Sequence, residues 1–311
     1  MKILYIDPLA GVSGDMLLGA LVDLGVDFHA LQHGLEHLGL NEFAITSEST
    51  KRHTIGATKV NVVVKDVPHP HRHLPDLVKI INASPLSESV KTQSIAALTK
   101  LAEAEAKVHR MPLEHVHLHE VGGLDCLVDV VGTVLALEMI KKTHGVQAIY
   151  CGPVSVGAGF VACAHGSMPL PAPGTLAILA GFPIRRTTFP FEMTTPTGAA
   201  LVTTLARPHT MPLLLTPEHI GYGAGTRDPK EVANLLRVLI AELHQQPKLE
   251  SHTHEHSHAE DHHHHDDHSH HDHPHDHDHE HDHHDHTHSH AHHHDGLEEV
   301  NHHEHGHEHP H

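Results

Sequence analysis

Residues 3–24 read ILYIDPLAGVSGDMLLGALVDL, and this stretch decides the fold class. The apolar run Ile3–Ile6 predicts a short buried strand. From Ser13 to Leu24 the apolar residues recur every three or four positions, which predicts a helix that ends at Gly25. A buried strand followed directly by an amphipathic helix is typical of proteins in which helices pack on a sheet.

The rest of the chain continues this pattern as far as residue 243. Helices are predicted at 28–38, 74–81, 87–108, 124–142, 175–179 and 199–206, and strands at 44–48 and 58–64. The helix at 124–142 is apolar almost all round, which indicates a central position. Residues 234–243 are predicted to form a final strand or helix. We therefore expect an α/β fold with helices packed on a mixed sheet, and a mixed α+β fold is the alternative.

Composition indicates two regions. Residues 1–246 are long enough to bury a core, which must consist of Leu, Val, Ile and Ala because the chain has no Trp and only 3% aromatic residues. Short Gly- and Pro-rich segments follow Ile149, so a second subdomain that begins near residue 147 is an alternative. Residues 247–311 lack apolar runs, and we expect them to form a disordered tail rich in His and Asp.

The tail is dominated by imidazole and carboxylate groups. Residues 252–311 hold 30 of the 46 histidines and 16 of the 39 acidic residues, without Lys or Arg. Neutral imidazole is a good ligand for nickel, copper and zinc, and most of these rings are unprotonated at pH 7. The tail therefore predicts metal binding, with the run His262, His263, His264 and His265 as its densest part.

Charge and cysteine content restrict the function classes. The formal net charge is −19, but removing the 16 acids of the tail leaves 23 acids against 20 bases, a net charge of −3. A nearly neutral body argues against nucleic-acid binding. Three cysteines without CxxC spacing predict buried, reduced thiols, and no apolar stretch is long enough to cross a membrane. We expect a soluble cytoplasmic protein with no membrane partner.

The sharpest motif outside the tail is His115-Val-His117-Leu-His119-Glu120. In an extended segment the three histidines would share one face and the two apolar residues the other. Three imidazoles that converge on one side predict a nickel or zinc site. An exposed polar segment is the alternative interpretation.

A second HxHxH motif contains His69, His71 and His73 and precedes a predicted helix. We interpret it as a metal-capture site beside the first motif, with a solvated loop as the alternative. Asp125 and Asp129 are four residues apart and therefore share a helix face. Asp125 near the helix start favours the positive end of the helix dipole, and Asp129 is a candidate for orienting a metal-bound imidazole.

Several turns are candidates for phosphate binding through backbone amides. The first runs from Asp7 to Met16 and includes Ser13 and Gly14, although it matches neither GxGxxG nor the Walker A motif. Asp7 and Asp15 of this turn are candidate metal ligands, and Ser13 as an ordinary helix N-cap is the alternative. The second is the helix start at Thr197, and the third is a glycine turn at 221–228 whose Arg227 is suited to bidentate contacts with an anion.

Taken together, these residues resemble the LarC family, the nickel-insertion proteins that mature the nickel-pincer nucleotide cofactor. The resemblance spans residues 2 to about 242. It rests on six motifs in order: Gly11-Val-Ser13-Gly14-Asp15-Met16, His71-Arg72-His73-Leu74, His117-Leu118-His119-Glu120-Val121-Gly122 with Asp125, His165-Gly166 with Pro169-Leu170-Pro171-Ala172-Pro173, Thr195-Pro196-Thr197-Gly198-Ala199, and Gly221-Tyr222-Gly223-Ala224-Gly225-Thr226-Arg227-Asp228.

The resemblance implies a chelatase-type reaction that places Ni(II) into pyridinium-3,5-bisthiocarboxylic acid mononucleotide. The product would serve lactate racemase or a similar apo-enzyme. Because a nickel–carbon bond forms only when the ring proton is lost, a base is needed, and His119 or Glu120 is the candidate, with Asp125 as a third catalytic candidate. The turns at Ser13, Gly14, Thr197 and Arg227 would then hold the nucleotide phosphate.

The resemblance also implies CTP with Mn or Mg. Longer family members continue past the segment that matches residues 234–238 into a further C-terminal domain, whereas here the His-rich tail follows. CTP handling is associated with that domain, so its site is expected outside this chain, and a separate C-terminal polypeptide is an expected partner. The alternatives are a metal-dependent hydrolase or phosphatase and a passive store of nickel or zinc.

Overall fold

The computed structural model describes residues 1–65, 72–116, 123–163 and 166–244. The chain divides into two compact units, Met1–Leu249 and Glu250–His311. The tail at 247–311, with its His262–His265 run, lies outside the described residues, so its metal binding stays a prediction, as does the subdomain boundary near residue 147.

Helices in the described part lie close to where the periodicity predicts them. They are α1 (Gly14–Asp23), α2 (Phe28–Glu36), α3 (Leu74–Ala83), α4 (Glu88–His109), α5 (Leu124–His144), α6 (Pro173–Ile178) and α7 (Pro196–Leu205), with a 3₁₀ helix η1 at Leu113–His115.

Eleven strands are present among the described residues. They are β1 (Lys2–Asp7), β2 (Phe43–Arg52), β3 (Ile55–Val64), β4 (Ala148–Cys151), β5 (Val154–Val156), β6 (Phe160–Cys163), β7 (Gly166–Pro169), β8 (Ile184–Arg186), β9 (Arg207–Pro208), β10 (Leu215–Ala224) and β11 (Leu235–Leu243).

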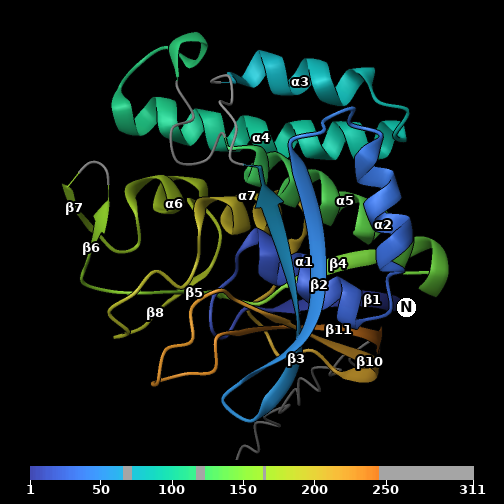
Figure 1. The fold of residues 1–311 in the computed structure, drawn as a ribbon. Coiled ribbons are helices and arrows are strands. Elements are labelled where there is room, and N and C mark those ends of the chain that lie inside the picture. The colour runs from blue at the N-terminus through green and yellow to red at the C-terminus, as the bar shows by residue number, and fades with distance from the viewer. Residues whose placement is uncertain (66–71, 117–122, 164–165, 245–311) are drawn as a thin grey trace, which may run out of the picture. The chain divides into compact units, whose positions relative to one another are not determined.

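Seven of the strands form one mixed sheet in the order β2-β3-β10-β11-β1-β4-β9. Strand β1 lies inside the sheet. It runs parallel to β4, with Leu4 opposite Ile149, and antiparallel to β11, with Leu4 also opposite Ile240. The hairpin of β2 and β3 forms one end of the sheet, and β9 forms the other end (Figure 1). The predicted α/β class with a mixed sheet is confirmed, and residues 234–243 form a strand.

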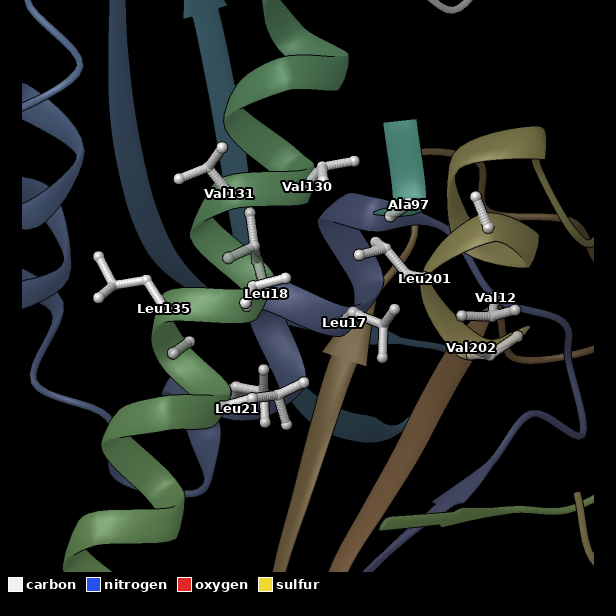
Figure 2. Close-up of a cluster of buried hydrophobic side chains, with 14 of the residues drawn as sticks. Val12, Leu17, Leu18, Leu21, Ala97, Val130, Val131, Leu135, Leu201 and Val202 are labelled. Atoms are coloured by element: carbon white, nitrogen blue, oxygen red, sulfur yellow. The ribbon is translucent and has the colours of Figure 1, made fainter. Parts of the chain in front are cut away.

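Helix α1 connects the sheet to the other helices. One side of it packs on β3, β10 and β11, and the other side contacts α5 and α7. Helix α5 is buried along most of its length and also contacts α2 and α4, so its central position is confirmed. Figure 2 shows the side chains that meet between these helices, which are Leu17, Leu18, Leu21, Val130, Val131, Leu135, Leu201 and Val202.

The core has the composition that the sequence predicts. Its buried apolar residues are almost all Leu, Val, Ile and Ala. Cys126 and Cys151 are buried and free, as expected. None of the helices in the described ranges combines the length and apolar character that crossing a bilayer requires.

The glycines of β10 correct one prediction. Residues 221–228 were expected to form a glycine turn, but Gly221 and Gly223 lie inside strand β10. A Cβ atom at Gly223 would lie 1.8 Å from the Met16 carbonyl oxygen, and one at Gly221 would lie 2.3 Å from the Ala20 carbonyl oxygen. These glycines therefore let α1 approach the strand closely, and the turn begins only at Gly225.

Candidate functional site: a cleft at the starts of α1 and α7

The turn that follows β1 lies directly against the turn that precedes α7. Gly11 has a φ of +91°, and a Cβ atom there would lie 2.0 Å from the Met193 carbonyl oxygen. A Cβ atom at Gly198 would lie 2.2 Å from the Val12 carbonyl oxygen. Only glycine fits both positions. The two motifs, about 190 residues apart in sequence, therefore each contain a glycine because their backbones touch.

Hydrogen bonds hold these two turns together. The Val12 backbone N–H donates to Thr194 Oγ1 (3.2 Å), and that buried hydroxyl donates to the Ser155 carbonyl (2.7 Å). The Thr195 backbone N–H donates to the Val12 carbonyl (3.1 Å). Thr195 also caps α7, because its Oγ1 accepts a hydrogen bond from the Gly198 N–H (3.2 Å). The predicted helix start at Thr197 is thereby confirmed.

Asp15 in the first turn of α1 is fully engaged by neighbouring groups. Its Oδ1 accepts from Ser13 Oγ and from the Met16 N–H. Its Oδ2 accepts from Lys59 Nζ and from Thr226 Oγ1. Ser13 occupies the N-cap position, but its side chain binds Asp15 instead of a backbone amide of the helix.

Lys59 of β3 is buried, with 5% of its surface exposed. Its ammonium group donates to Asp15 and, at 2.8 Å, to Thr226 Oγ1. The ion pair with Asp15 offsets the cost of burying both charges. Lys59 therefore links the start of α1 to the turn after β10.

That turn, residues 225–228, is fixed from two other elements. Arg52 of β2 donates through Nε and Nη2 to the Gly225 carbonyl, and Asn234 Nδ2 donates to the Arg227 carbonyl (3.0 Å). The Arg227 side chain itself is exposed at the cleft described below. Its backbone is thus ordered while its guanidinium group is available to a ligand.

Two aspartates of α5 lie beside the start of α1. Asp125 is exposed in the first helical turn, and Asp129 lies one turn further along the same face. A Cβ atom at Gly14 would lie 2.4 Å from Asp129 Oδ2, so only glycine fits there. Burial raises the pKa of Asp129 well above its usual range; Asp15 and Asp125 raise it further, and Lys59 lowers it.

A cleft of about 520 Å³ brings these groups together. All four predicted phosphate-binding residues, Ser13, Gly14, Thr197 and Arg227, line it. The other lining residues are Asp15, Lys59, Val60, Asn61, Val62, Asp125, Asp129, Val161, Met168, Ala172, Glu192, Thr195, Pro196 and Thr226. The cleft therefore collects parts of five of the six sequence motifs, with Asp125 from the third, together with Asp129 in one cavity.

Three other site candidates in the described ranges lie elsewhere. Asp7 forms an ion pair with Arg237 of β11 and does not line the cleft. The hydrogen bond that Arg237 donates to Asp7 raises the pKa of Arg237. His73 precedes α3, as expected, and its Nδ1 lies 3.1 Å from the Val116 carbonyl oxygen. His115 is exposed at the end of η1, so the prediction that 115–119 is extended is wrong at its first residue.

The remaining histidine candidates are not described. His69, His71, His117 and His119, together with Glu120, lie outside the described residues. Among the residues that are described, no three His, Cys, Asp or Glu side chains are arranged to hold a metal ion. The proposed metal roles of Asp7, Asp15, His73 and His115 thus find no shared site in this part of the chain.

Comparison with known proteins decides the family. Residues 4–270 match the family described as nickel insertion protein. The chain belongs to this family. A nickel insertion protein from Desulfitobacterium hafniense, named for pyridinium-3,5-bisthiocarboxylic acid mononucleotide, is 42% identical over 248 residues, which cover 80% of this chain and 60% of that protein.

Two further relatives agree. A protein of the same name from Geobacillus kaustophilus is 41% identical over 251 residues, which cover 78% of this chain and 60% of the relative. A relative from Dictyoglomus thermophilum is 43% identical over 243 residues, with coverages of 78% and 61%. The chain thus spans about three fifths of the length of these curated relatives. No solved structure matches the chain.

Sequence reasoning about this nickel-insertion family member missed Lys59 and Thr226. Lys59 stands in an alternating strand, where a lysine normally points to solvent. Its burial follows from Asp15, which is 44 residues away in sequence. Thr226 lies within a motif that had been singled out, but the sequence carries no signal that its hydroxyl joins Lys59 to Asp15.

Cys126 lies behind the cleft and provides a test of the packing there. Its Sγ is 3.5 Å from Thr197 Oγ1, and burial raises the pKa of the thiol to about 12. At pH 8 only roughly one thiol in ten thousand would be ionised, so we expect Cys126 to resist alkylation in the folded protein. Peptide mass spectrometry after iodoacetamide treatment, with and without guanidinium, measures this. Alkylation of Cys126 in the native chain at the rate of a free cysteine would contradict the packing.

Proposed function

We propose that this chain inserts Ni(II) into pyridinium-3,5-bisthiocarboxylic acid mononucleotide, which binds in the cleft. The observation that carries the proposal is that one cavity gathers the turns at Ser13, Thr197 and Arg227 in a member of the nickel insertion family. The names of the relatives from D. hafniense and G. kaustophilus supply the substrate class.

The nucleotide phosphate is proposed to bind where α1 and α7 begin. Both helices are 10 residues long and begin at the cleft, where the positive ends of their dipoles lie. The N–H groups of Met16 and Gly198 are capped by Asp15 and Thr195, so the N–H groups proposed to bind phosphate are those of Gly14, Asp15 and Thr197. Arg227 adds a guanidinium group suited to bidentate contacts with phosphate. Lys59 neutralises Asp15, which would otherwise repel an anion at this point.

Nickel is proposed to arrive on histidine and to leave on sulfur. Imidazole binds Ni(II) well but, unlike a closed thiolate site, can release the ion to the two sulfur groups of the precursor. The contact between His73 and Val116 supports joint action of the two HxHxH motifs. His73 is the last histidine of the motif at 69–73, and Val116 lies within the motif at 115–119. The tail would act as the collecting reservoir.

Bond formation between nickel and the ring carbon releases a proton, for which His119 or Glu120 is the proposed acceptor. Both residues precede Asp125, which lines the cleft, by only a few positions. Asp125 is the third catalytic candidate. The finished cofactor would pass to lactate racemase or a similar apo-enzyme.

CTP with Mn or Mg, which the resemblance implies, is proposed as a co-reactant that is handled by a C-terminal domain like that of the longer family members. We derive no step through it.

The proposal is tested by incubating the purified chain with Ni(II) and the precursor, with and without CTP, Mg²⁺ and the C-terminal domain of a relative. Mass spectrometry of the released nucleotide and activation of apo-lactate racemase are the readouts. We expect a nickel-containing nucleotide when all components are present. A chain that neither binds the precursor nor yields this product under any of these conditions would contradict the proposal.

Removal of the tail separates collection of nickel from its insertion. A chain that ends at Glu250 is expected to bind far fewer Ni(II) ions, because it lacks the 30 tail histidines. Its insertion rate should fall at limiting nickel and recover at saturating nickel. Equilibrium dialysis and the insertion assay across a nickel titration measure the two effects. If insertion stays lost at saturating nickel, the tail does more than collect the ion.

A further inference from the structure

Asp129 lines the cleft but has no part in the phosphate and nickel binding proposed above. Its Oδ1 atom is buried and has no hydrogen-bond partner among the described residues. A buried carboxyl oxygen without a partner is costly, because it has lost its water and gained nothing in return. Oδ1 itself is enclosed by protein, but the Oδ2 atom of the same carboxyl group lies on the side of Gly14 and is not enclosed, and it also has no hydrogen-bond partner among the described residues. A ligand in the cleft can therefore reach the carboxyl group through Oδ2 and supply the missing partner.

The position of Asp129 indicates which part of the ligand this is. The carboxyl group lies against Gly14, the first residue of α1, where the phosphate is proposed to bind. In a 5′-mononucleotide the ribose is attached directly to that phosphate. A sugar that follows a phosphate held at Gly14 therefore brings its hydroxyl groups to the side of the cleft that Asp129 forms.

The charge state of Asp129 suits a hydroxyl partner next to a phosphate. Burial, with Asp15 and Asp125 nearby, raises the pKa of the Asp129 carboxyl group. A neutral carboxylic acid offers one donor and one acceptor and adds no negative charge beside the anion. A hydroxyl group, which also donates and accepts, matches it in both roles.

We propose that Asp129 binds a ribose hydroxyl of the pyridinium mononucleotide and so selects ribonucleotides over deoxyribonucleotides. The inference rests on the proposed function, which supplies the nucleotide. It makes Asp129 a specificity-determining residue that acts before nickel is inserted.

The test is a double-mutant cycle between protein and ligand, measured by calorimetry on the full chain with EDTA present. The probes are pyridinium-3-carboxylic acid mononucleotide and its 2′-deoxy and 3′-deoxy analogues. We expect Asp129→Ala to weaken binding of the ribonucleotide about tenfold and to leave binding of one deoxy analogue unchanged. Asp129→Asn, a neutral isostere with a donor and an acceptor, should restore most of the affinity.

Asp125→Ala is the matched control, since it removes a cleft carboxyl group one turn away on the same helix face. It should change the affinity for all three probes by the same factor. If Asp129→Ala also weakens all three equally, the inference is wrong while the proposed function stands. If the wild-type chain binds none of the probes and does not bind the thiocarboxylate precursor either, the proposed function fails and the inference fails with it.

Discussion

His119→Ala and Glu120→Ala are each expected to lower the rate of nickel insertion by at least about a hundredfold. The reaction replaces a ring C–H bond with a carbon–nickel bond, so a group near the metal must accept the proton. Imidazole and carboxylate are the side chains with suitable basicity near neutral pH, and these two belong to the motif that leads into the cleft residue Asp125.

Two measurements separate this chemical role from nickel supply. Equilibrium dialysis should give the same nickel stoichiometry, within one or two ions, for the wild type and both variants, because the tail is intact. His262→Ala is the matched control: it removes one of 30 tail histidines and should leave insertion unchanged. If both the His119→Ala and the Glu120→Ala variants insert nickel at the wild-type rate, neither residue is the base.

Lys59→Met is expected to destabilise the fold by about 3 kcal/mol, because it leaves the Asp15 carboxylate beside Asp129 without its cation. For a folded unit of this size, the melting temperature should fall by roughly 6 to 12 °C. The same change removes the ammonium group that bridges Asp15 and Thr226, so the start of α1 and the turn that carries Arg227 stay joined only by the hydrogen bond from Thr226 Oγ1 to Asp15.

Thermal and urea unfolding of single and double variants test this expectation. Lys59→Met combined with Asp15→Asn should be more stable than Lys59→Met alone, since the uncompensated charge is gone. Lys142→Met provides the control, because its ion pair with Glu138 lies on the surface and should contribute at most about 0.5 kcal/mol. Equal effects of Lys59→Met and Lys142→Met would show that the buried pair does not stabilise the fold.

Periodicity in the sequence was sufficient to locate most elements of the fold. Apolar spacing placed α1, α4 and α5 close to their observed bounds, and the β-branched runs placed β2 and β3 as a pair. These elements depend on local patterns of burial, which the sequence records directly. The order of strands in the sheet depends on contacts between distant segments, and no local pattern encodes it.

Glycines were the residues most easily misread. Gly221 and Gly223 were expected in a turn, yet they lie in β10 because α1 leaves no space for a Cβ atom. Gly11 lies in the turn after β1 and Gly198 at the start of α7, as expected, but the sequence does not reveal that each makes room for the other's segment. A glycine motif therefore indicated a close approach without identifying the approaching partner.

The candidate site was predictable in its parts but not in its assembly. Ser13, Gly14, Thr197 and Arg227 were each identified from local turn chemistry, and one cleft contains all four. Lys59 was missed because its partner is distant in sequence. The metal candidates Asp7 and Asp15 are instead engaged by Arg237 and Lys59, side chains that local motifs cannot anticipate.

Hydrogen–deuterium exchange of the full chain, with and without the precursor mononucleotide, tests the central claim most directly. The claim is that the separated turns form one nucleotide-binding cleft. We predict that the precursor slows exchange in three segments at once, at residues 13–17, 197–200 and 225–228. Slower exchange confined to one of these segments, or none in any of them at saturating precursor, would contradict the account.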